Sequence, residues 1–186
     1  MRNLPNRLIP CAVAAGMVAP SIGLACWADA ERLYGVSSHL LYAVARAESN
    51  LRTDALNLTH RARTGTYDIG LMQINSSHLP KLARLGISPI DLFDPCTNIM
   101  VGAWLLADSF ARRGVSWDAV GAYNAACARL AGDDCSAARA RYAWRVYSRL
   151  PGSPAGAQPL EASVATRTDR ATAAPAPLIL SARAAR

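Results

Sequence analysis

Glu48 is the residue whose type and position first suggest chemistry. Leu41, Val44, Ala45 and Glu48 follow the i, i+3, i+4, i+7 spacing of one helical face. A carboxylate that ends a buried stripe loses hydration, which disfavours its charged form and raises its pKa. A raised pKa is what a general acid needs near neutral pH. An ordinary solvated glutamate near a helix end is the competing interpretation of this residue taken alone.

Asp68 is the only nearby candidate for a second carboxylate. It could align a water molecule for hydrolysis, but the sequence favours a residue that holds its loop through a hydrogen bond. The three histidines show no HExxH spacing, and the chain has neither a CxxC pair nor a glycine-rich phosphate loop. We therefore expect no metal and no cofactor.

The N-terminus predicts a cleavable secretory signal. Arg2 and Arg7 precede a mostly apolar stretch over residues 9–24, which is short for a membrane span of roughly 20 residues. Cleavage fits after Ala25 or after Ala30. We expect a signal peptide at residues 1–25, a periplasmic mature protein and no membrane anchor after cleavage.

Cysteine parity favours cleavage after Ala25, because four of the five cysteines then remain in an oxidising compartment. Those four are Cys26, Cys96, Cys127 and Cys135. They permit three pairings. Cys127 and Cys135 could close a short loop, and Cys26 with Cys96 would then tie the mature N-terminus to the middle of the domain.

The elements that must position Glu48 are mainly helical. Helical patterns are expected over residues 27–34, 40–49, 80–85, 95–113 and 137–150, with a further helix opening at Ser116. Residues 50–69 predict a loop with at most a small β-hairpin near residues 64–69. The predicted fold is one mainly α domain at residues 26–150, followed by a disordered, Ala/Pro-rich tail at residues 151–186.

The net charge of +7 suits a protein that meets anionic polymers of the cell envelope. The arginines are scattered and no basic run is interleaved with aromatic residues, so we expect no nucleic acid as a partner.

Three short segments occur together in one order: residues 47–49 (Ala-Glu-Ser), residues 70–75 (Gly-Leu-Met-Gln-Ile-Asn) and residues 122–125 (Ala-Tyr-Asn-Ala). In this order they resemble the catalytic domain of the soluble lytic transglycosylases, which has a lysozyme-like globular fold. Residues 94–99 and 116–125 add a resemblance to the small exported members that accompany secretion, conjugation and pilus machines. The likeness covers roughly residues 26–150.

This resemblance implies a role for each matching position. Glu48 would be the single catalytic acid and base. The residues implied to line the sugar site or to contact the glycan are Ser49, Met72, Gln73, Tyr123 and Asn124. The Tyr123 hydroxyl would lie beside the catalytic carboxylate. Trp104 and Trp117 could also stack on sugars, although burial is the favoured interpretation of both.

The implied substrate is peptidoglycan, and the implied partner is an envelope-spanning secretion, conjugation or pilus machine. A site with one carboxylate can cleave a glycosidic bond if the substrate supplies the second group. The N-acetyl group and the 6-hydroxyl of N-acetylmuramic acid could do so, which would give a 1,6-anhydro product. Two alternatives remain: a lysozyme-type hydrolase that uses Asp68, and a non-catalytic peptidoglycan-binding component.

Overall fold

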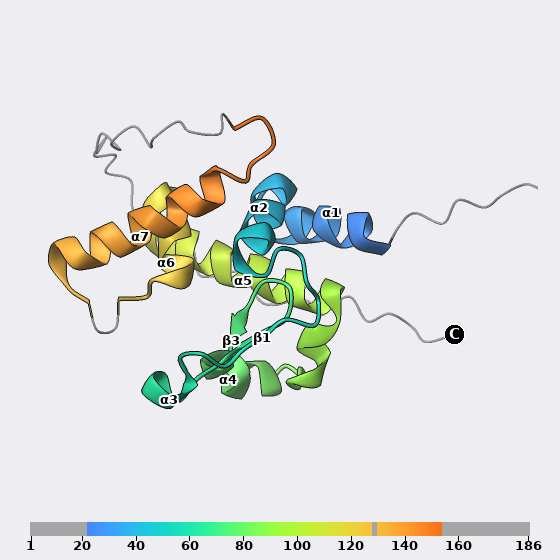
Figure 1. Ribbon diagram of the computed structural model, residues 1–186. Coiled ribbons are helices and arrows are strands. Elements are labelled where there is room, and N and C mark those ends of the chain that lie inside the picture. Colours follow the sequence, from blue (N-terminus) through green and yellow to red (C-terminus); the bar gives the residue numbers. More distant parts are fainter. Residues whose placement is uncertain (1–21, 128–129, 154–186) are drawn as a thin grey trace, which may run out of the picture.

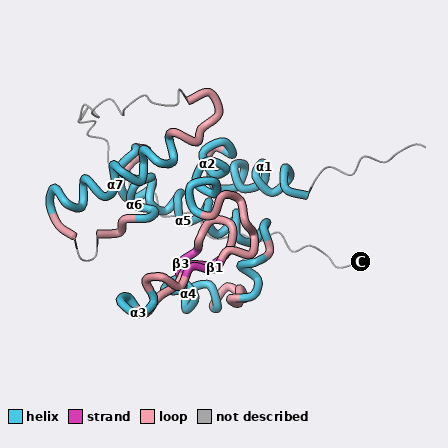
Figure 2. Tube along the Cα trace, in the orientation of Figure 1, coloured by secondary structure: helices cyan, strands magenta, loops and turns pink. Residues whose placement is uncertain are grey.

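The structure is a computed structural model that describes residues 22–127 and 130–153. Those residues form seven α-helices and one three-stranded sheet of very short strands (Figures 1 and 2). The prediction of a mainly α, lysozyme-like domain is confirmed. Most of the predicted signal peptide and nearly all of the predicted tail, from residue 154 on, lie outside the described residues.

Helix α5 (Pro95–Arg113) is the central element. It contacts α1 (Ile22–Tyr34), α2 (Ser38–Glu48), α6 (Trp117–Asn124) and β3 (Ile74–Asn75). Its start is fixed by two features: the Asp94 side chain accepts a hydrogen bond from the Thr97 amide at 2.8 Å, and proline takes the first helical position. Helix α5 is buried on most of its surface, so it forms the core on which the other elements pack.

The sheet lies on one side of α5, together with α3 (Arg61–Thr64) and α4 (Leu79–Ala83). Its order is β1 (Leu56–Asn57), β2 (Asp68–Ile69) and β3, all antiparallel. The small hairpin expected near residues 64–69 is present in part: β2 falls in this range and pairs with both β1 and β3, and the turn between β2 and β3 covers residues 70–73. The preceding loop instead forms helix α3.

A close approach at Gly70 fixes this turn. Gly70 has φ +75°, and a Cβ there would lie 2.3 Å from Nδ2 of Asn98. Asn98 is fully buried on α5 and donates to the carbonyls of Ile69 (3.0 Å) and Leu92 (2.7 Å). A glycine is required at this position because an L side chain would meet both strained backbone and occupied space.

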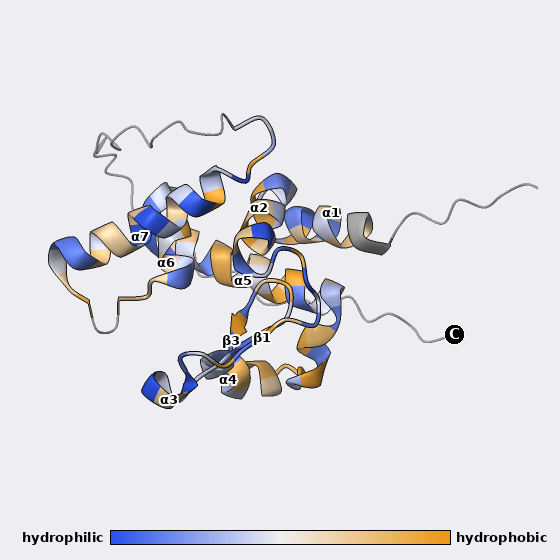
Figure 3. Ribbon diagram, viewed as in Figure 1, coloured by the Kyte–Doolittle hydropathy of each residue, from blue (hydrophilic) through white to orange (hydrophobic). Residues whose placement is uncertain are grey.

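Helix α7 (Gly132–Tyr147) begins five residues before the predicted start at residue 137. Its first turn is polar and carries no apolar pattern, which is why periodicity did not detect it. Figure 3 shows α7 as more hydrophilic than α5. It packs closely against α6, where a Cβ on Gly121 would come within 2.6 Å of Arg139.

Both disulfides of the favoured pairing are present. Cys26 joins Cys96 with a Cα–Cα distance of 5.2 Å, and Cys127 joins Cys135 at 5.6 Å. The first links α1 to the start of α5, and the second links the end of α6 to α7. Over residues 22–127 and 130–153, no helix is long and apolar enough to cross a membrane.

We expect the Cys26–Cys96 disulfide to contribute more stability than the Cys127–Cys135 disulfide. They close separations of 70 and 8 residues, which the chain-entropy model equates with about 4 and about 2.5 kcal/mol. Alanine substitution of each pair, followed by denaturant unfolding, measures both. An equal loss of free energy of unfolding in the two double variants would contradict the expectation.

Candidate active site

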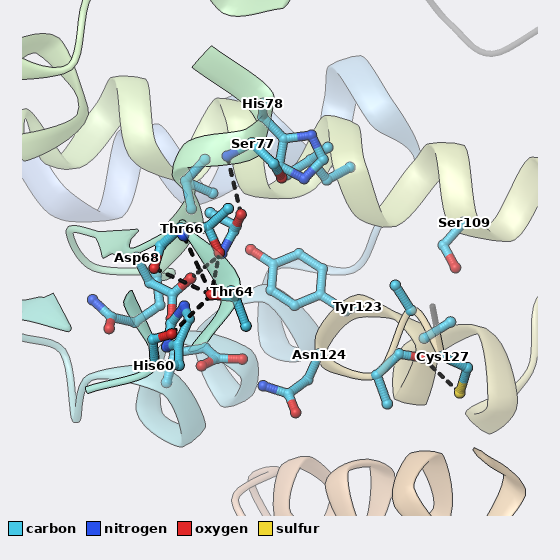
Figure 4. A pocket seen from close by; sticks show the side chains of 18 of the residues that line it. His60, Thr64, Thr66, Asp68, Ser77, His78, Ser109, Tyr123, Asn124 and Cys127 are labelled. Carbon is cyan, nitrogen blue, oxygen red and sulfur yellow. Dashed lines mark hydrogen bonds and ion pairs between the residues drawn. The ribbon is translucent and has the colours of Figure 1, made fainter. Parts of the chain in front are cut away.

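A cleft of about 960 Å³ runs between the sheet and α6. Glu48, Asp68, Gln73, Tyr123 and Asn124 all line it. Figure 4 shows Tyr123 in the middle of the cleft, with Thr66 and Asp68 on one side and Ser109 and Cys127 on the other. The fold thus brings three sequence segments that are far apart in the chain to one cavity.

Glu48 is the last residue of α2, one turn beyond the buried Val44 and Ala45. Loss of hydration is the main cause that raises the pKa of the half-buried Glu48 carboxyl to about 7, and the nearby charge of Asp68 is a smaller cause in the same direction. A hydrogen bond from Tyr142 and the positive charge of Arg145 act in the opposite direction. Near neutral pH the carboxyl is therefore divided between its acid and base forms.

Tyr142 is the functional residue that sequence reasoning missed. Its hydroxyl donates to Oε1 of Glu48 at 2.5 Å, although 94 residues separate the two positions. Tyr142 lies on the face of α7 that packs into the core, and it is only 3% exposed. The available signal was chemical, since a buried tyrosine hydroxyl needs a hydrogen-bond partner.

Tyr123 lines the same cleft as Glu48, and its hydroxyl hydrogen-bonds to the backbone of the segment at residues 70–75. Its hydroxyl donates to the backbone carbonyl of Met72 at 3.0 Å, and its ring stacks on Tyr142 with centroids 6.4 Å apart. Burial, with the charge of Glu48 as the next cause, raises the pKa of Tyr123 well above its usual value. The same holds for the pKa of Tyr142. Both hydroxyls therefore stay protonated, and Tyr142 supplies the hydrogen bond to Glu48.

Ser49 and Met72 hold the cleft wall in place. Neither belongs to the residues that line the cleft. The buried Ser49 hydroxyl donates to the Leu71 carbonyl at 2.7 Å, and the Met72 amide donates to Oδ1 of Asn98 at 2.7 Å. The Met72 side chain is fully buried against Gly102, where a Cβ would lie 2.4 Å from its sulfur. These contacts position residues 70–75 against α2 and α5.

Gln73 and Asn124 do reach the cleft. Gln73 adopts φ +50°, and its side-chain amide donates to the carbonyls of Gly70 (2.8 Å) and Ala55 (3.3 Å). Asn124 ends α6 and is exposed to solvent in the cleft. Asn124 is therefore open to a ligand, whereas the side-chain NH2 of Gln73 already holds the backbone at Ala55 and Gly70.

Asp68 holds its own loop in place through hydrogen bonds, which is the role that the sequence favoured. Its carboxylate accepts hydrogen bonds from the side-chain amides of Asn75 (2.7 Å) and Asn57 (3.3 Å), which lie on the two neighbouring strands. Nε2 of His60 lies 3.6 Å from the same group. This network ties the three strands together and keeps a second carboxylate on the wall of the cleft.

Of the two tryptophans, only Trp104 is buried as the sequence favoured. Trp104 is buried at 4% exposed, and Lys81 Nζ lies 4.1 Å from its ring centroid. Trp117 is 41% exposed and packs edge-on against Tyr147. Neither lines the cleft.

The chemistry available in the cleft is proton transfer. One carboxyl group titrates near neutrality, and a neutral phenol fixes one of its oxygens. Within the described part of the chain, no group of three or more His, Cys, Asp or Glu side chains could hold a metal ion.

Comparison with known proteins gives this cleft a family. Residues 25–140 match the model of the transglycosylase SLT domain. The chain is 42% identical over 134 residues to the invasion protein IagB of Salmonella typhimurium, covering 70% of this chain and 79% of IagB. It is 37% identical over 128 residues to a peptidoglycan-binding-like protein of Escherichia coli O157:H7, covering 66% and 74%.

A third relative is the X polypeptide of Escherichia coli, 48% identical over 101 residues that make up 54% of this chain and 58% of that protein. The family model spans well over half of the 186 residues and includes Glu48 and Tyr123. The chain therefore belongs to the transglycosylase SLT domain family, whose members are lytic transglycosylases of peptidoglycan.

Proposed function

We propose that this protein cleaves the bond between N-acetylmuramic acid and N-acetylglucosamine in peptidoglycan and leaves a 1,6-anhydro-muramoyl end. The observation that carries the proposal is Glu48 in the cleft, with a pKa of about 7 and a hydrogen bond from Tyr142. A group of this pKa can donate a proton and then accept one at the same pH.

The proposed reaction has two steps. Protonated Glu48 first donates its proton to the glycosidic oxygen, and the bond from that oxygen to C1 breaks while the substrate's N-acetyl group stabilises C1. The Glu48 carboxylate then accepts the proton of the 6-hydroxyl, whose oxygen attacks C1. The glutamate returns to its starting state, and no water is consumed.

Tyr142 would hold Glu48 through both steps. Its hydrogen bond fixes Oε1 in the cleft and stabilises the carboxylate that forms when the proton leaves. Arg145 lies with its Cζ 4.9 Å from the Tyr142 ring centroid, and its positive charge also favours the carboxylate. Tyr142 and Arg145 therefore offset part of the free-energy cost of ionising the dehydrated Glu48 carboxyl.

A lysozyme-type hydrolysis is the second candidate, because Asp68 also lines the cleft and could align a water. Its hydrogen bonds to Asn57 and Asn75 favour the structural role. Mass spectrometry of the muropeptides separates the two reactions, since a hydrolysed end is heavier by one water.

The proposed setting is the periplasm, where the protein would open peptidoglycan locally for an envelope-spanning secretion, conjugation or pilus machine. The secretory character of residues 1–25 and the two disulfides support export. The similarity to a protein named for invasion supports a link to such a machine. Fractionation of cells that express the full chain, with and without residues 1–25, tests the export.

Glu48→Gln is expected to abolish the release of anhydro-muropeptides from purified sacculi, because glutamine cannot exchange a proton. The rate of muropeptide release should fall at least about 100-fold when a general acid and base is removed. Retained turnover would rule out the proposed mechanism. A non-catalytic binding role, the remaining alternative, predicts sacculus binding without turnover in both proteins.

Tyr142→Phe is expected to move the alkaline limb of the pH–rate profile to higher pH. The Tyr142 hydrogen bond lowers the pKa of Glu48, so its removal raises that pKa and keeps the acid form to higher pH. The maximal rate should fall because Oε1 loses its fixed partner. Tyr147→Phe is the matched control, since Tyr147 lies on the same helix and packs against Trp117 and Trp144. Identical profiles for both variants would contradict this role.

Glu48→Gln is also expected to stabilise the protein, and the gain should depend on pH. The folded-state pKa of about 7 lies above the unfolded value of 4.5, so ionisation disfavours the folded state. The wild-type protein therefore loses stability as pH rises from about 4.5 through about 7. Denaturant unfolding should show little difference at pH 4 and a gain of about 3 kcal/mol for the variant at pH 8. A pH-independent difference would argue against a dehydrated Glu48.

A further inference from the structure

The cleft carries more positive than negative side chains, although a sugar ring is neutral. The cationic or titratable basic residues that line it are Arg63, Arg112, Arg113, His60 and His78. The acidic residues that line it are Glu48, Asp68 and Asp108. The three arginines come from α3 and from the last turn of α5.

The two aspartates of the cleft have partners within the protein. Asp108 forms an ion pair with Arg112 one turn along α5. Asp68 accepts the hydrogen bonds of Asn57 and Asn75 and lies beside His60. Neither aspartate is therefore placed to neutralise further positive charge, and Glu48 is partly neutral at pH 7.

Arg113 is the cleft arginine with an unengaged guanidinium. It is the last residue of α5, it is exposed, and it makes no hydrogen bond or ion pair with any other residue that the structure describes. Its guanidinium has five donors in a planar fork that matches a carboxylate. The carbonyl end of α5 holds this cation at the helix terminus that favours positive charge.

A second observation shows positive potential in this part of the cleft. Burial lowers the pKa of His78, and the positive charges of Lys81 and then Arg112 lower it further. Burial is the largest cause, and the two cations show that positive charge also acts on His78 at this wall of the cleft. An anion that entered here would be stabilised by the same field.

We propose that the Arg113 end of the cleft binds a carboxylate of the peptide stem that muramic acid carries, so that the enzyme prefers stem-bearing glycan over stem-free glycan. The stem carboxylates are the anionic groups on an otherwise neutral strand, and they sit on the very sugar that reacts. Arg63 on α3 adds positive charge to the opposite wall. This inference rests on the proposed function and names the substrate class of the same site.

The test compares Arg113→Gln and Arg113→Glu with the wild type on two substrates. One is solubilised peptidoglycan strands with intact stems, and the other is the same strands after an amidase has removed the stems. The ratio of kcat/KM on stem-bearing to stem-free strands should fall roughly three- to fivefold in Arg113→Gln. It should fall further in Arg113→Glu, and added salt should lower the wild-type ratio because an exposed charge contact is screened.

Arg84→Gln is the matched control, because Arg84 is exposed, follows α4 and does not line the cleft. It makes the same change in net charge and should keep the wild-type ratio. An unchanged ratio in both Arg113 variants, or an equal fall in Arg84→Gln, would overturn the inference.

A binding experiment separates this inference from the proposed reaction. In the Glu48→Gln background, stem-bearing strands should bind more tightly than stem-free strands, and Arg113→Gln should remove that difference. This result would stand even if the products proved to be hydrolysed instead of anhydro ends. Equal binding of the two strands by the Glu48→Gln protein would refute the role of Arg113 while leaving the reaction untouched.

Discussion

The hydrogen bond between Tyr142 and Glu48 is the interaction on which the arrangement of this protein depends. A carboxyl group that is stripped of part of its water is costly to ionise, and without a donor its direction in the cleft would be undefined. The donor comes from α7, and α7 can reach the end of α2 only because both helices pack on the same core. The contact between α2 and α7 therefore contributes to the packing of the core and also places Tyr142 against Glu48 in the candidate active site.

The other contacts of the site serve to hold backbone in place. The Ser49 hydroxyl donates to the Leu71 carbonyl, and the Tyr123 hydroxyl donates to the Met72 carbonyl. The Asn98 side chain accepts a hydrogen bond from the Met72 amide and donates to the carbonyls of Ile69 and Leu92. Together they fix residues 70–75 from three helices. The motif residues that sequence comparison would assign to sugar contact are thus divided between scaffold (Ser49 and Met72) and cleft lining (Gln73 and Asn124).

Electrostatics divide the cleft into two parts. Around Glu48, loss of hydration and the charge of Asp68 keep the acid form populated at neutral pH. Toward the end of α5, arginines line the cleft, and Arg112 together with Lys81 places positive charge near His78. This division matches a neutral sugar chain with acidic side branches. The reacting glycosidic bond needs a proton donor, whereas the acidic branches are stabilised by positive charge.

The sequence by itself predicted most of the helices and singled out Glu48 as the candidate reactive group. Local signals are strong where they act within a few residues: Asp94-Pro95 starts α5, Ser116 caps α6, and the periodic face of α2 ends at Glu48. It also named both observed disulfides among the three possible pairings, because Cys127 and Cys135 are close in sequence. The family resemblance then supplied Gln73, Tyr123 and Asn124 as cleft residues, and the sequence had singled out Asp68 as the nearby second carboxylate.

Only the tertiary structure decided which tyrosine serves Glu48 and how the strands pair. Tyr142 and Tyr123 both sit on apolar helical faces, and no local pattern tells which hydroxyl will meet a carboxylate 94 or 75 residues away. The pairing of β2 with β3 depends on Asn98 of α5, a residue distant in sequence. Hydrogen-bond partners of buried groups are set by packing, because burial forces each polar atom to find whichever donor or acceptor the fold brings to it.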